Sequence, residues 1–356
     1  MPDFDRNSPF DDLPRLPPKA DIETIEIMRA CIRASRSLAE LQGLVSTIPD
    51  KRILLELLTL QESESSSAIE NIVSSKKRLF MAVSGDPEKA DSSTREILGY
   101  NRALLSASGT IPDMDVIKGI CTSIKGEGMD YRDSDDEQVG LFGAGSRVAV
   151  YTPPSGASVR GLMRNLMEYI FTDDEVDPLI KMAVIHYQFE AIHPFFDGNG
   201  RTGRILNIIY LQYSKLIADP LLFISDYIIE NKTRYYELLG NVTKEGDWES
   251  WILFMLEAVD IVSRRTISRI GRITSMVKDC KDGARSLSVP EACIYAVFSN
   301  PYCTITNMMD SLGCSRPSAS KYLKALESIG MLRSVRTEKG LVYVNNLLIE
   351  EFSRVE

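Results

Sequence analysis

The stretch from His193 to Arg204 joins two strongly helical patterns, and this junction constrains the fold more than any other part of the chain. Apolar side chains recur three and four residues apart in residues 178–192 and again in residues 202–216. Pro194 stops the first helix, because proline lacks a backbone N–H and restricts the residue before it. Gly198-Asn199-Gly200 then leads directly into the second helix. The sequence therefore predicts a mainly α fold with a sharp, glycine-rich corner.

Most of the remaining chain also has helical periodicity. The expected helices cover residues 20–45, 49–80, 94–107, 157–171, 235–242 and 248–273. The serine run in the second of them predicts a break near Ser65–Ser67, because serine favours helix starts over helix interiors. Residues 125–147 are rich in loop-forming residues, and RVAVYTPPSG after them predicts a short strand or hairpin. Residues 277–290 are polar, lack periodicity and are interpreted as a linker.

Composition and charge argue against several classes of protein. Hydrophobic residues at 44% and charged residues at 26% are ordinary for a globular chain. The net charge of −9 argues against broad, nonspecific binding of nucleic acid. The six cysteines are scattered without a CxxC pair, and the N-terminus lacks the layout of a signal peptide. No apolar run approaches the length of about 18 residues that a membrane span needs. We therefore expect no membrane partner and a reducing, cytoplasmic location.

The residues of the corner combine the groups that a phosphate-transfer site needs. His193 has an ordinary pKa that suits a general base near neutral pH. Asp197 is a hard oxygen ligand of the kind that Mg²⁺ accepts beside phosphates. The turn of residues 198–200 points backbone N–H groups and the positive end of a helix dipole at one spot, which favours an anion. Arg201 and Arg204 lie three residues apart on the first turn of the helix, on one face, where both can hold phosphates.

This run resembles the signature of the Fic-domain family, HPFx(D/E)GNGRxxR, at every defined position. KMAVIHYQFEAIHPF is similar to the family's preceding helix, YRDSDDEQVG to its pre-flap segment, and VAVYTPPSG to its target-positioning flap. YYELLGNVTKEGDWESWILFML resembles the downstream helices, and DLPRLPP and LQESESSSAIENIVSS resemble the N-terminal region of long members. The resemblance covers roughly residues 10–262 and implies a Fic-type helical core with a short β-hairpin flap. Most members transfer AMP from ATP to a hydroxyl side chain of a target protein.

The resemblance also implies individual roles. His193 would take the proton from a Ser, Thr or Tyr hydroxyl of the target, and Asp197 would bind Mg²⁺ that bridges the phosphates. Tyr235, and less securely Tyr236, matches a position near the adenine, although a buried core tyrosine fits the sequence equally well. The flap would pair with the main chain of the target. The residues assigned to ATP are Gly198, Asn199, Gly200, Arg201, Thr202, Gly203, Arg204 and Tyr235, and those assigned to the flap are Val148, Ala149, Val150, Tyr151 and Thr152.

SSAIEN, residues 66–71, matches the family's inhibitory pattern (S/T)xxxE(G/N). The resemblance implies that Glu70, four residues after Ser66, pairs with Arg204 and competes with the γ-phosphate of ATP. A plain solvated glutamate is the alternative, and in some relatives the same glutamate supports removal of AMP. Gly200 stands where phosphorylating members carry lysine, which favours AMP transfer over phosphate transfer. Another nucleotide, or a diphosphate-linked group, stays open as the donor.

Residues 291–356 resemble a winged helix, with helices ending at SLG and ESIG and the alternating wing RSVRTEKGLVYV. The module contains seven basic and seven acidic residues, so DNA and a protein partner fit it equally well. A DNA-binding regulator with a nucleotide-sensing core is therefore the rival function, and a homodimer is compatible with the sequence. The basic and polar residues expected to face DNA are Arg316, Ser318, Ser320, Lys321 and Lys324 on the recognition helix and Arg333, Arg336 and Lys339 in the wing.

The sequence thus predicts four parts along the chain. Residues 1–110 form an N-terminal helical region with an inhibitory helix near residues 66–71, and residues 111–262 form the catalytic core. Residues 263–290 supply a connecting helix and linker, and residues 291–356 form the winged helix. The functional hypothesis is a protein adenylyltransferase that uses ATP and Mg²⁺, modifies an unknown target protein and itself, and is inhibited by its own Glu70.

Overall fold

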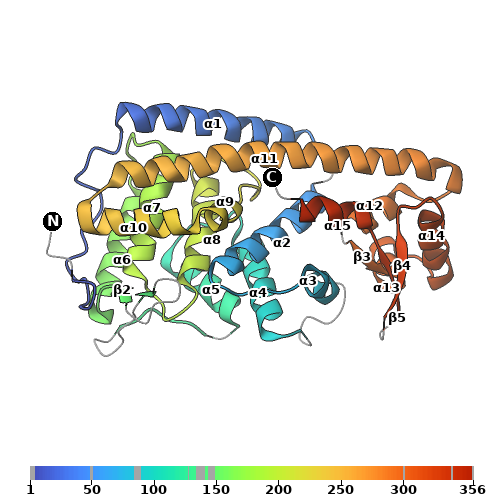
Figure 1. The fold of residues 1–356 in the computed structure, drawn as a ribbon, viewed down its shortest axis with the longest axis horizontal. Helices are drawn as coiled ribbons and strands as arrows, with labels where there is room; N and C mark the ends of the chain where they lie inside the picture. Colours follow the sequence, from blue (N-terminus) through green and yellow to red (C-terminus); the bar gives the residue numbers. More distant parts are fainter. Residues whose placement is uncertain are drawn as a thin grey trace.

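A computed structural model describes residues 5–48, 51–83, 90–126, 128–133, 141–142, 149–299, 301–337 and 340–354. The described chain is mainly helical, as the sequence predicted (Figure 1). Its N-terminal half contains α1 (Ile25–Ser46), α2 (Arg52–Ile69), α3 (Lys76–Val83), α4 (Ser92–Ala107), α5 (Met114–Lys125), β1 (Leu141–Phe142), β2 (Ala149–Tyr151), α6 (Gly156–Phe171) and α7 (Pro178–Ile192). Its C-terminal half contains α8 (Asn199–Tyr213), α9 (Ser225–Glu230), α10 (Lys232–Glu245), α11 (Trp248–Ala284), α12 (Glu291–Ser299), β3 (Tyr302–Thr304), α13 (Ile305–Leu312), α14 (Arg316–Ser328), β4 (Arg333–Thr337), β5 (Gly340–Val344) and α15 (Asn346–Ser353).

The long helix α11 runs along one edge of the molecule, with α1 packed beside it (Figure 1). Its 37 residues, at 1.5 Å each, span about 55 Å. The N-terminal half of α11 is buried against the core, where Trp251 donates its indole N–H to the Ala183 carbonyl of α7 over 2.8 Å. The C-terminal half continues to the unit formed by residues 291–354, drawn in orange and red. One helix therefore belongs to both parts of the molecule.

Helix α7 lies at the centre of the core, and its side chains are buried on nearly every side. This explains why the helix is apolar around its whole circumference instead of along one stripe. Its start is fixed by Asp177, whose side chain accepts a hydrogen bond from the Leu179 amide, and by Pro178 in the first turn. Since α7 is enclosed, its C-terminal end cannot shift without disturbing the helices around it.

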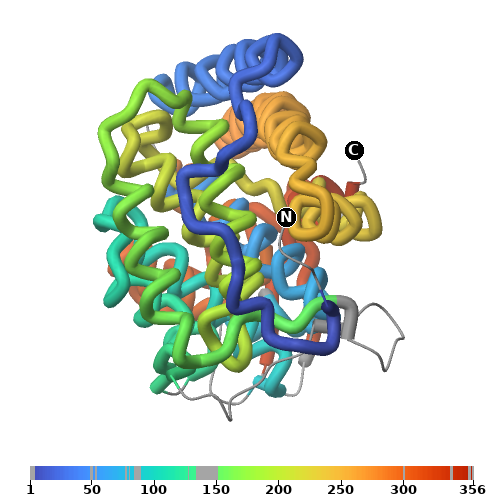
Figure 2. Tube along the Cα trace, turned by 90° about the vertical axis from the view of Figure 1, so that its left-hand side faces the viewer, coloured from blue at the N-terminus to red at the C-terminus, as the bar shows by residue number. Residues whose placement is uncertain are grey.

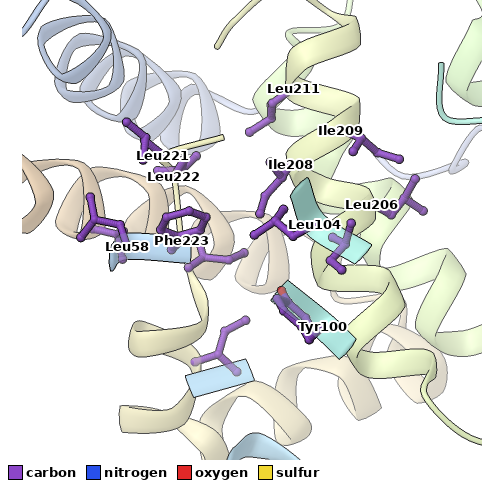
Figure 3. Packing of buried hydrophobic residues seen from close by; sticks show 14 of the residues in the cluster. Leu58, Tyr100, Leu104, Leu206, Ile208, Ile209, Leu211, Leu221, Leu222 and Phe223 are labelled. Atoms are coloured by element: carbon purple, nitrogen blue, oxygen red, sulfur yellow. The ribbon is translucent and has the colours of Figure 1, made fainter. Parts of the chain in front are cut away.

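The hydrophobic core continues from α7 across α8 to α4 and α2. Figure 3 shows Tyr100 and Leu104 of α4 facing Ile208 of α8, with Leu58 of α2 and Phe223 completing the cluster. All five side chains are buried. Helix α2 is thus packed into the core beside α4 and α8, and its C-terminal end reaches the start of α8. This packing matters for the site described below.

Two of the predicted element boundaries are wrong. The serine run does not break the helix, because Ser65–Ser67 lie inside α2, where Ser65 hydrogen-bonds Asp226 of α9 and Ser66 binds an arginine of α8. These partners bind the serine hydroxyls, which would otherwise hydrogen-bond the backbone and weaken the helix. The helix instead ends at Ile69. Residues 277–290 are not a linker over most of their length either, since α11 continues to Ala284 and a 3₁₀ turn, Arg285–Leu287, follows it.

The C-terminal unit has the order helix, strand, two helices, two strands and a final helix, and its antiparallel sheet has the strand order β3-β5-β4. This is the order expected of the predicted winged helix, whose identification as such stays a prediction. Arg272 of α11 holds the buried Glu351 of α15 over 2.7 Å, which ties the unit to the long helix. Of the side chains expected to face DNA, Arg316, Lys321, Lys324, Arg333 and Arg336 are exposed, Ser318 and Ser320 are half-buried, and Lys339 lies outside the described residues.

The N-terminal segment lies along the surface of α6 and α7 (Figure 2). The amide of Leu16 hydrogen-bonds the Asn165 side chain, and Gln188 of α7 donates to the Pro14 carbonyl. Further along, the Phe10 amide donates to the Thr152 carbonyl, next to strand β2. None of the described helices is long and apolar enough to cross a membrane. The predicted domain boundaries stay predictions, and the one at residue 262 falls inside α11.

The contact between α4 and α5 gives a stability prediction. A Cβ at Gly99 would lie 2.8 Å from the Ser123 carbonyl oxygen and 2.9 Å from that of Ile124, and backbone atoms cannot move aside. Gly99→Ala should therefore lower the free energy of unfolding by about 1–3 kcal/mol. Gly119→Ala is the matched control, because this exposed position inside α5 has nothing within 4 Å of the added methyl. It should raise stability by about 0.5–1 kcal/mol. Urea unfolding of both variants tests this, and equal stability of the two would contradict it.

Candidate active site

His193 forms the corner between α7 and the turn that leads to α8. It caps α7 in the left-handed conformation, with φ 49° and ψ 61°, and its amide still donates to the Phe189 carbonyl over 3.0 Å. Burial lowers the pKa of His193 to about 4, and the positive charge of Arg132 acts in the same direction. The imidazole is therefore neutral near pH 7, as a group that accepts a proton has to be.

The turn after His193 is built from residues that allow it to be tight. Gly198 is the N-cap of α8 with φ 84°, a conformation that glycine adopts without strain. Asn199 closes the turn, because its side chain accepts from the Phe195 amide over 2.9 Å and donates to the Phe195 carbonyl over 2.8 Å. The Asn199 side chain thus shapes the turn, whereas the free amides of the α8 N-terminus provide an anion site.

Arg204 lies in the first turns of α8, is almost completely buried and is held by α2. Its Nε donates to the Ser66 hydroxyl over 2.7 Å, and its Nη2 donates to the Ser66 carbonyl and to Glu70 Oε1 over 2.8 and 3.0 Å. Burial alone would lower the pKa of Arg204, but Glu70 together with the nearby Tyr235, Glu190 and Tyr100 side chains outweighs burial and raises it. The structure thus brings together the Ser66, Glu70 and Arg204 side chains that the sequence pattern grouped.

The Glu70 carboxylate also lies against the glycine turn. A Cβ at Gly200 would collide with Glu70 Oε1 and would come within 2.9 Å of Arg204 Nη1. A carboxylate therefore sits at the N-terminal end of α8, between a glycine without a side chain and a buried arginine. This is the kind of place that binds anions, and here an anionic side chain of the same chain fills it.

Arg201 does not share the partner of Arg204. Its Nη1 donates to Glu96 of α4 over 2.7 Å, and its Nη2 lies 3.7 Å from the Asp197 carboxylate. The two arginines therefore turn to different neighbouring helices, although the sequence suggested one common face. Sequence reasoning missed Glu96, because nothing in its own surroundings along the chain marks it as a partner of α8.

Asp197 is the proposed metal ligand, and its side chain is 60% exposed beside the glycine turn. Lys125, the last residue of α5, donates to Asp197 Oδ2 over 2.6 Å and to Glu96 over 3.3 Å. The carboxylate thus already accepts a cation from within the protein. The described residues contain no group of three or more side chains that could hold a metal alone. A single exposed carboxylate beside an anion site fits Mg²⁺, which keeps several waters and takes its other ligands from phosphates.

The remaining residues assigned to ATP are buried around α8. Thr202 is completely buried, and a Cβ at Gly203 would come within 3.0 Å of the Phe189 ring. Tyr235 is only 2% exposed, and its hydroxyl pairs with the buried His186 over 2.9 Å. The structure thus places Tyr235 in the core, which was one of the two alternatives. Its neighbour Tyr236 is 47% exposed and is the ring of the pair that a ligand can reach.

The flap meets α7 just before His193. Strands β1 and β2 pair antiparallel, and the Tyr151 hydroxyl donates to the Ala191 carbonyl of α7 over 2.8 Å. Thr152 is buried, and its hydroxyl donates to the Arg6 carbonyl. Ala149 and Val150 belong to β2, and Val148 lies outside the described residues. The end of β2 is thus anchored to α7 two residues before the base.

Three family models match the chain in sequence order. The Fic/DOC family N-terminal model matches residues 28–108, and the Fic/DOC family model matches residues 94–211, which include the corner and both arginines. The C-terminal domain of SoFic-like protein adenylyltransferases matches residues 290–348. The chain belongs to the Fic/DOC family.

Relatives with curated names agree with this assignment. A probable protein adenylyltransferase of Aquifex aeolicus is 40% identical over 76 residues, which are 21% of each chain. Protein adenylyltransferase fic-1 of Caenorhabditis elegans is 27% identical over 123 residues, covering 34% of this Fic protein and 23% of the relative. The matches thus span about a fifth of the length of these relatives.

Solved structures share the fold. A Fic family protein from Desulfovibrio desulfuricans superposes with a TM-score of 0.60 at 19% identity, over 92% of this chain and 98% of that one. Fic-1 of C. elegans superposes with a TM-score of 0.51 at 20% identity, over 69% and 74% of the two chains. At these identities the superpositions establish the Fic fold alone.

Proposed function

We propose that this Fic protein transfers AMP from ATP to a hydroxyl side chain of a target protein, and that Glu70 inhibits the transfer. The observation that carries the proposal is the Glu70 carboxylate on Arg204 and against Gly200, which marks the α8 N-terminus as an anion site. His193 stands at the same turn as a neutral base. The names of the relatives and the Fic/DOC match support a nucleotide as the anion.

The reaction follows from what these residues can do. The target hydroxyl oxygen forms a bond to the α-phosphorus of ATP, and the bond from that phosphorus to the oxygen bridging to the β-phosphorus breaks. The hydroxyl proton passes to the neutral His193 ring, and pyrophosphate leaves. The backbone amides at the start of α8 and the Arg204 guanidinium stabilise the negative charge on the phosphates. Asn199 keeps these amides in place by closing the turn.

A divalent cation would be held at Asp197, whose carboxylate already attracts Lys125. When bound, Mg²⁺ neutralises part of the charge that collects on the departing pyrophosphate. The target would lie along the hairpin of β1 and β2, because an extended segment can add to a strand edge without strict sequence requirements. Tyr236 is the exposed ring available for stacking on the adenine.

The inhibition follows from competition for one arginine. Arg204 is 1% exposed and its hydrogen bonds are directed to Ser66 and Glu70, so a γ-phosphate has to replace the Glu70 carboxylate to reach it. Two anions cannot occupy the same small space beside Gly200, because no positive charge remains for the second. Helix α2 is packed into the core, and this packing keeps Glu70 close to Arg204.

The test is incubation with Mg²⁺ and ATP labelled either at the α- or at the γ-phosphate, followed by detection of labelled protein. Label from the α-position alone, on the Fic protein itself or on a protein from a cell extract, is the expected result. Label from the γ-position would make the protein a phosphotransferase and overturn the proposal. Release of AMP from a previously modified protein would point to AMP removal instead. A salt-dependent gel shift on duplex DNA without any label would favour a DNA-binding regulator.

A further inference from the structure

The conformation of His193 needs support that α7 itself cannot give. A residue with a Cβ in the left-handed region is strained, and such strain persists only when the surroundings fix it. The last carbonyl groups of a helix also lack partners within the helix. The carbonyls of Ile192, His193 and Pro194 come in sequence at this end of α7, next to the ring that acts as the base.

A single residue outside the motif contacts all three carbonyls. Arg132 is completely buried, and its Nη2 donates to the Ile192 carbonyl over 3.1 Å and its Nε to the His193 carbonyl over 3.0 Å. Its backbone amide donates to the Pro194 carbonyl over 2.9 Å. The planar, forked guanidinium is suited to two adjacent oxygens at once, which a lysine ammonium is not.

The residue before Arg132 holds the other side of the corner. The Tyr131 ring stacks on Phe195, with ring centroids 4.9 Å apart and planes 23° from parallel. Its hydroxyl donates to the Met114 carbonyl, at the start of α5, over 2.6 Å. Residues 131 and 132 therefore contact residues 192–195 together, and the Tyr131 hydroxyl fixes them to the start of α5.

We propose that Arg132 is a positioning residue for the base: it holds the main chain of the corner so that the His193 ring faces the reacting hydroxyl. The proposal rests on the function proposed above and adds a residue that lies more than 60 positions from the motif in sequence. Arg132 contacts the main-chain carbonyls of α7 and the corner, which are not groups expected to touch ATP.

Because Arg132 is charged, it affects the pKa of His193, which a purely structural role in packing would not change. Three charged groups act on the His193 ring, namely Arg132 before the flap, Glu70 at the end of α2 and Asp197 in the following turn, and the backbone of Glu190 on α7 also acts on the ring. Burial and Arg132 lower the pKa of His193, whereas Glu70 and Asp197 raise it. Removing the Arg132 charge should therefore raise this pKa, and keeping the charge should leave it low.

Two variants separate geometry from charge. Arg132→Lys keeps the charge but loses the fork, and Arg132→Met loses both. Arg160→Met is the control, because Arg160 is an exposed arginine that pairs with Asp133 next to Arg132. The chain has only two histidines, so protein with isotope-labelled histidine gives two imidazole signals, and His193→Ala identifies which one belongs to His193. An NMR pH titration then measures the pKa of His193 without any enzymatic turnover.

The expected titration result is a higher His193 pKa in Arg132→Met and a pKa close to that of the parent in Arg132→Lys and Arg160→Met. In the Glu70→Gly background, both Arg132 variants should lower kcat for AMP transfer by about a hundredfold, the typical effect of a displaced catalytic group. KM for ATP should stay within a few-fold, because Arg132 binds the main chain of the corner. Arg160→Met should change neither constant.

The proposal is overturned if Arg132→Met melts at the temperature of the parent and has both the kcat and the His193 pKa of the parent. A loss confined to KM for ATP would also overturn it, because a positioning residue for the base acts on the chemical step. If the Glu70→Gly parent transfers no AMP, the proposed function fails, while the titration still tests the coupling between Arg132 and His193. If Arg132→Met does not fold, Arg132→Lys has to show the loss of kcat.

Discussion

Replacing Glu70 by glycine is expected to raise AMP transfer by about ten- to a hundredfold. The carboxylate makes a 3.0 Å ion pair with a nearly completely buried arginine, and hydrogen bonds to charged groups contribute about 1.5–3 kcal/mol. Since about 1.4 kcal/mol corresponds to a tenfold change in binding, removing this competitor frees Arg204 by that factor. The backbone tolerates glycine here, because Glu70 is the C-cap of α2 with φ −89° and lies outside the helix proper.

The measurement is the initial rate of label transfer from α-labelled ATP to the protein itself, at equal protein concentration. Glu70→Gln separates charge from shape, because it keeps the length of the side chain and removes the charge, so its rate should also rise. Asn71→Gly is the matched control: Asn71 already has a φ of 61°, which glycine adopts freely, and the variant retains the carboxylate. Equal rates for the parent and Glu70→Gly, with ATP bound equally by both, would show that Glu70 does not inhibit.

Replacing His193 by alanine in the Glu70→Gly protein is expected to lower kcat by about 10²–10⁴-fold. This is the range that a positioned general acid or base contributes, and no second histidine can substitute, because His186 is buried against Tyr235 and Asn207. ATP binding should persist, since the amides of α8 and Arg204 are unchanged. Calorimetric titration of Glu70→Gly/His193→Ala with ATP and Mg²⁺ tests this directly. Loss of binding together with loss of rate would mean that His193 supports the nucleotide site and does not only act as the base.

The pH dependence of AMP transfer by the Glu70→Gly protein also tests whether His193 is the base. Burial and Arg132 lower the pKa of His193 to about 4, so the base is neutral over the whole range near pH 7. The rate should stay level as the pH falls from neutral and drop only as the pH passes through the pKa of His193. Removing the Glu70 charge shifts that pKa further down, because the carboxylate raises it in the parent. A decline centred on the ordinary histidine pKa of about 6.5 would contradict this assignment.

The corner itself could be predicted from the sequence, because its geometry is local. Pro194 has to end α7, and a glycine has to provide the positive φ at residue 198, so the order of the residues almost determines the turn. The grouping of Ser66, Glu70 and Arg204 could be predicted only through the family resemblance. Residues more than 130 positions apart meet here, and nothing within α2 alone points to α8.

What could not be predicted depends on tertiary partners. Tyr235 and Tyr236 are adjacent and chemically identical, and only the packing of α10 on α11 decides that the first is buried and the second exposed. Arg201 and Arg204 share one turn, yet Glu96 on one side and Glu70 on the other draw them apart. Arg132 was missed for a related reason: its partners are backbone carbonyls, which every residue carries, so no sequence pattern marks them.

The length of α11 has a consequence for any molecule that the C-terminal unit holds. One continuous helix of about 55 Å serves both parts, and Arg272 in its C-terminal half binds Glu351. The C-terminal unit is therefore attached through a stiff helix and not through a flexible linker. A flexible linker raises the local concentration of a bound molecule in every direction, whereas a stiff helix raises it only at a fixed distance and angle. A molecule bound to the C-terminal unit would reach His193 only if its length matched that fixed distance. A shorter one would gain nothing from being held.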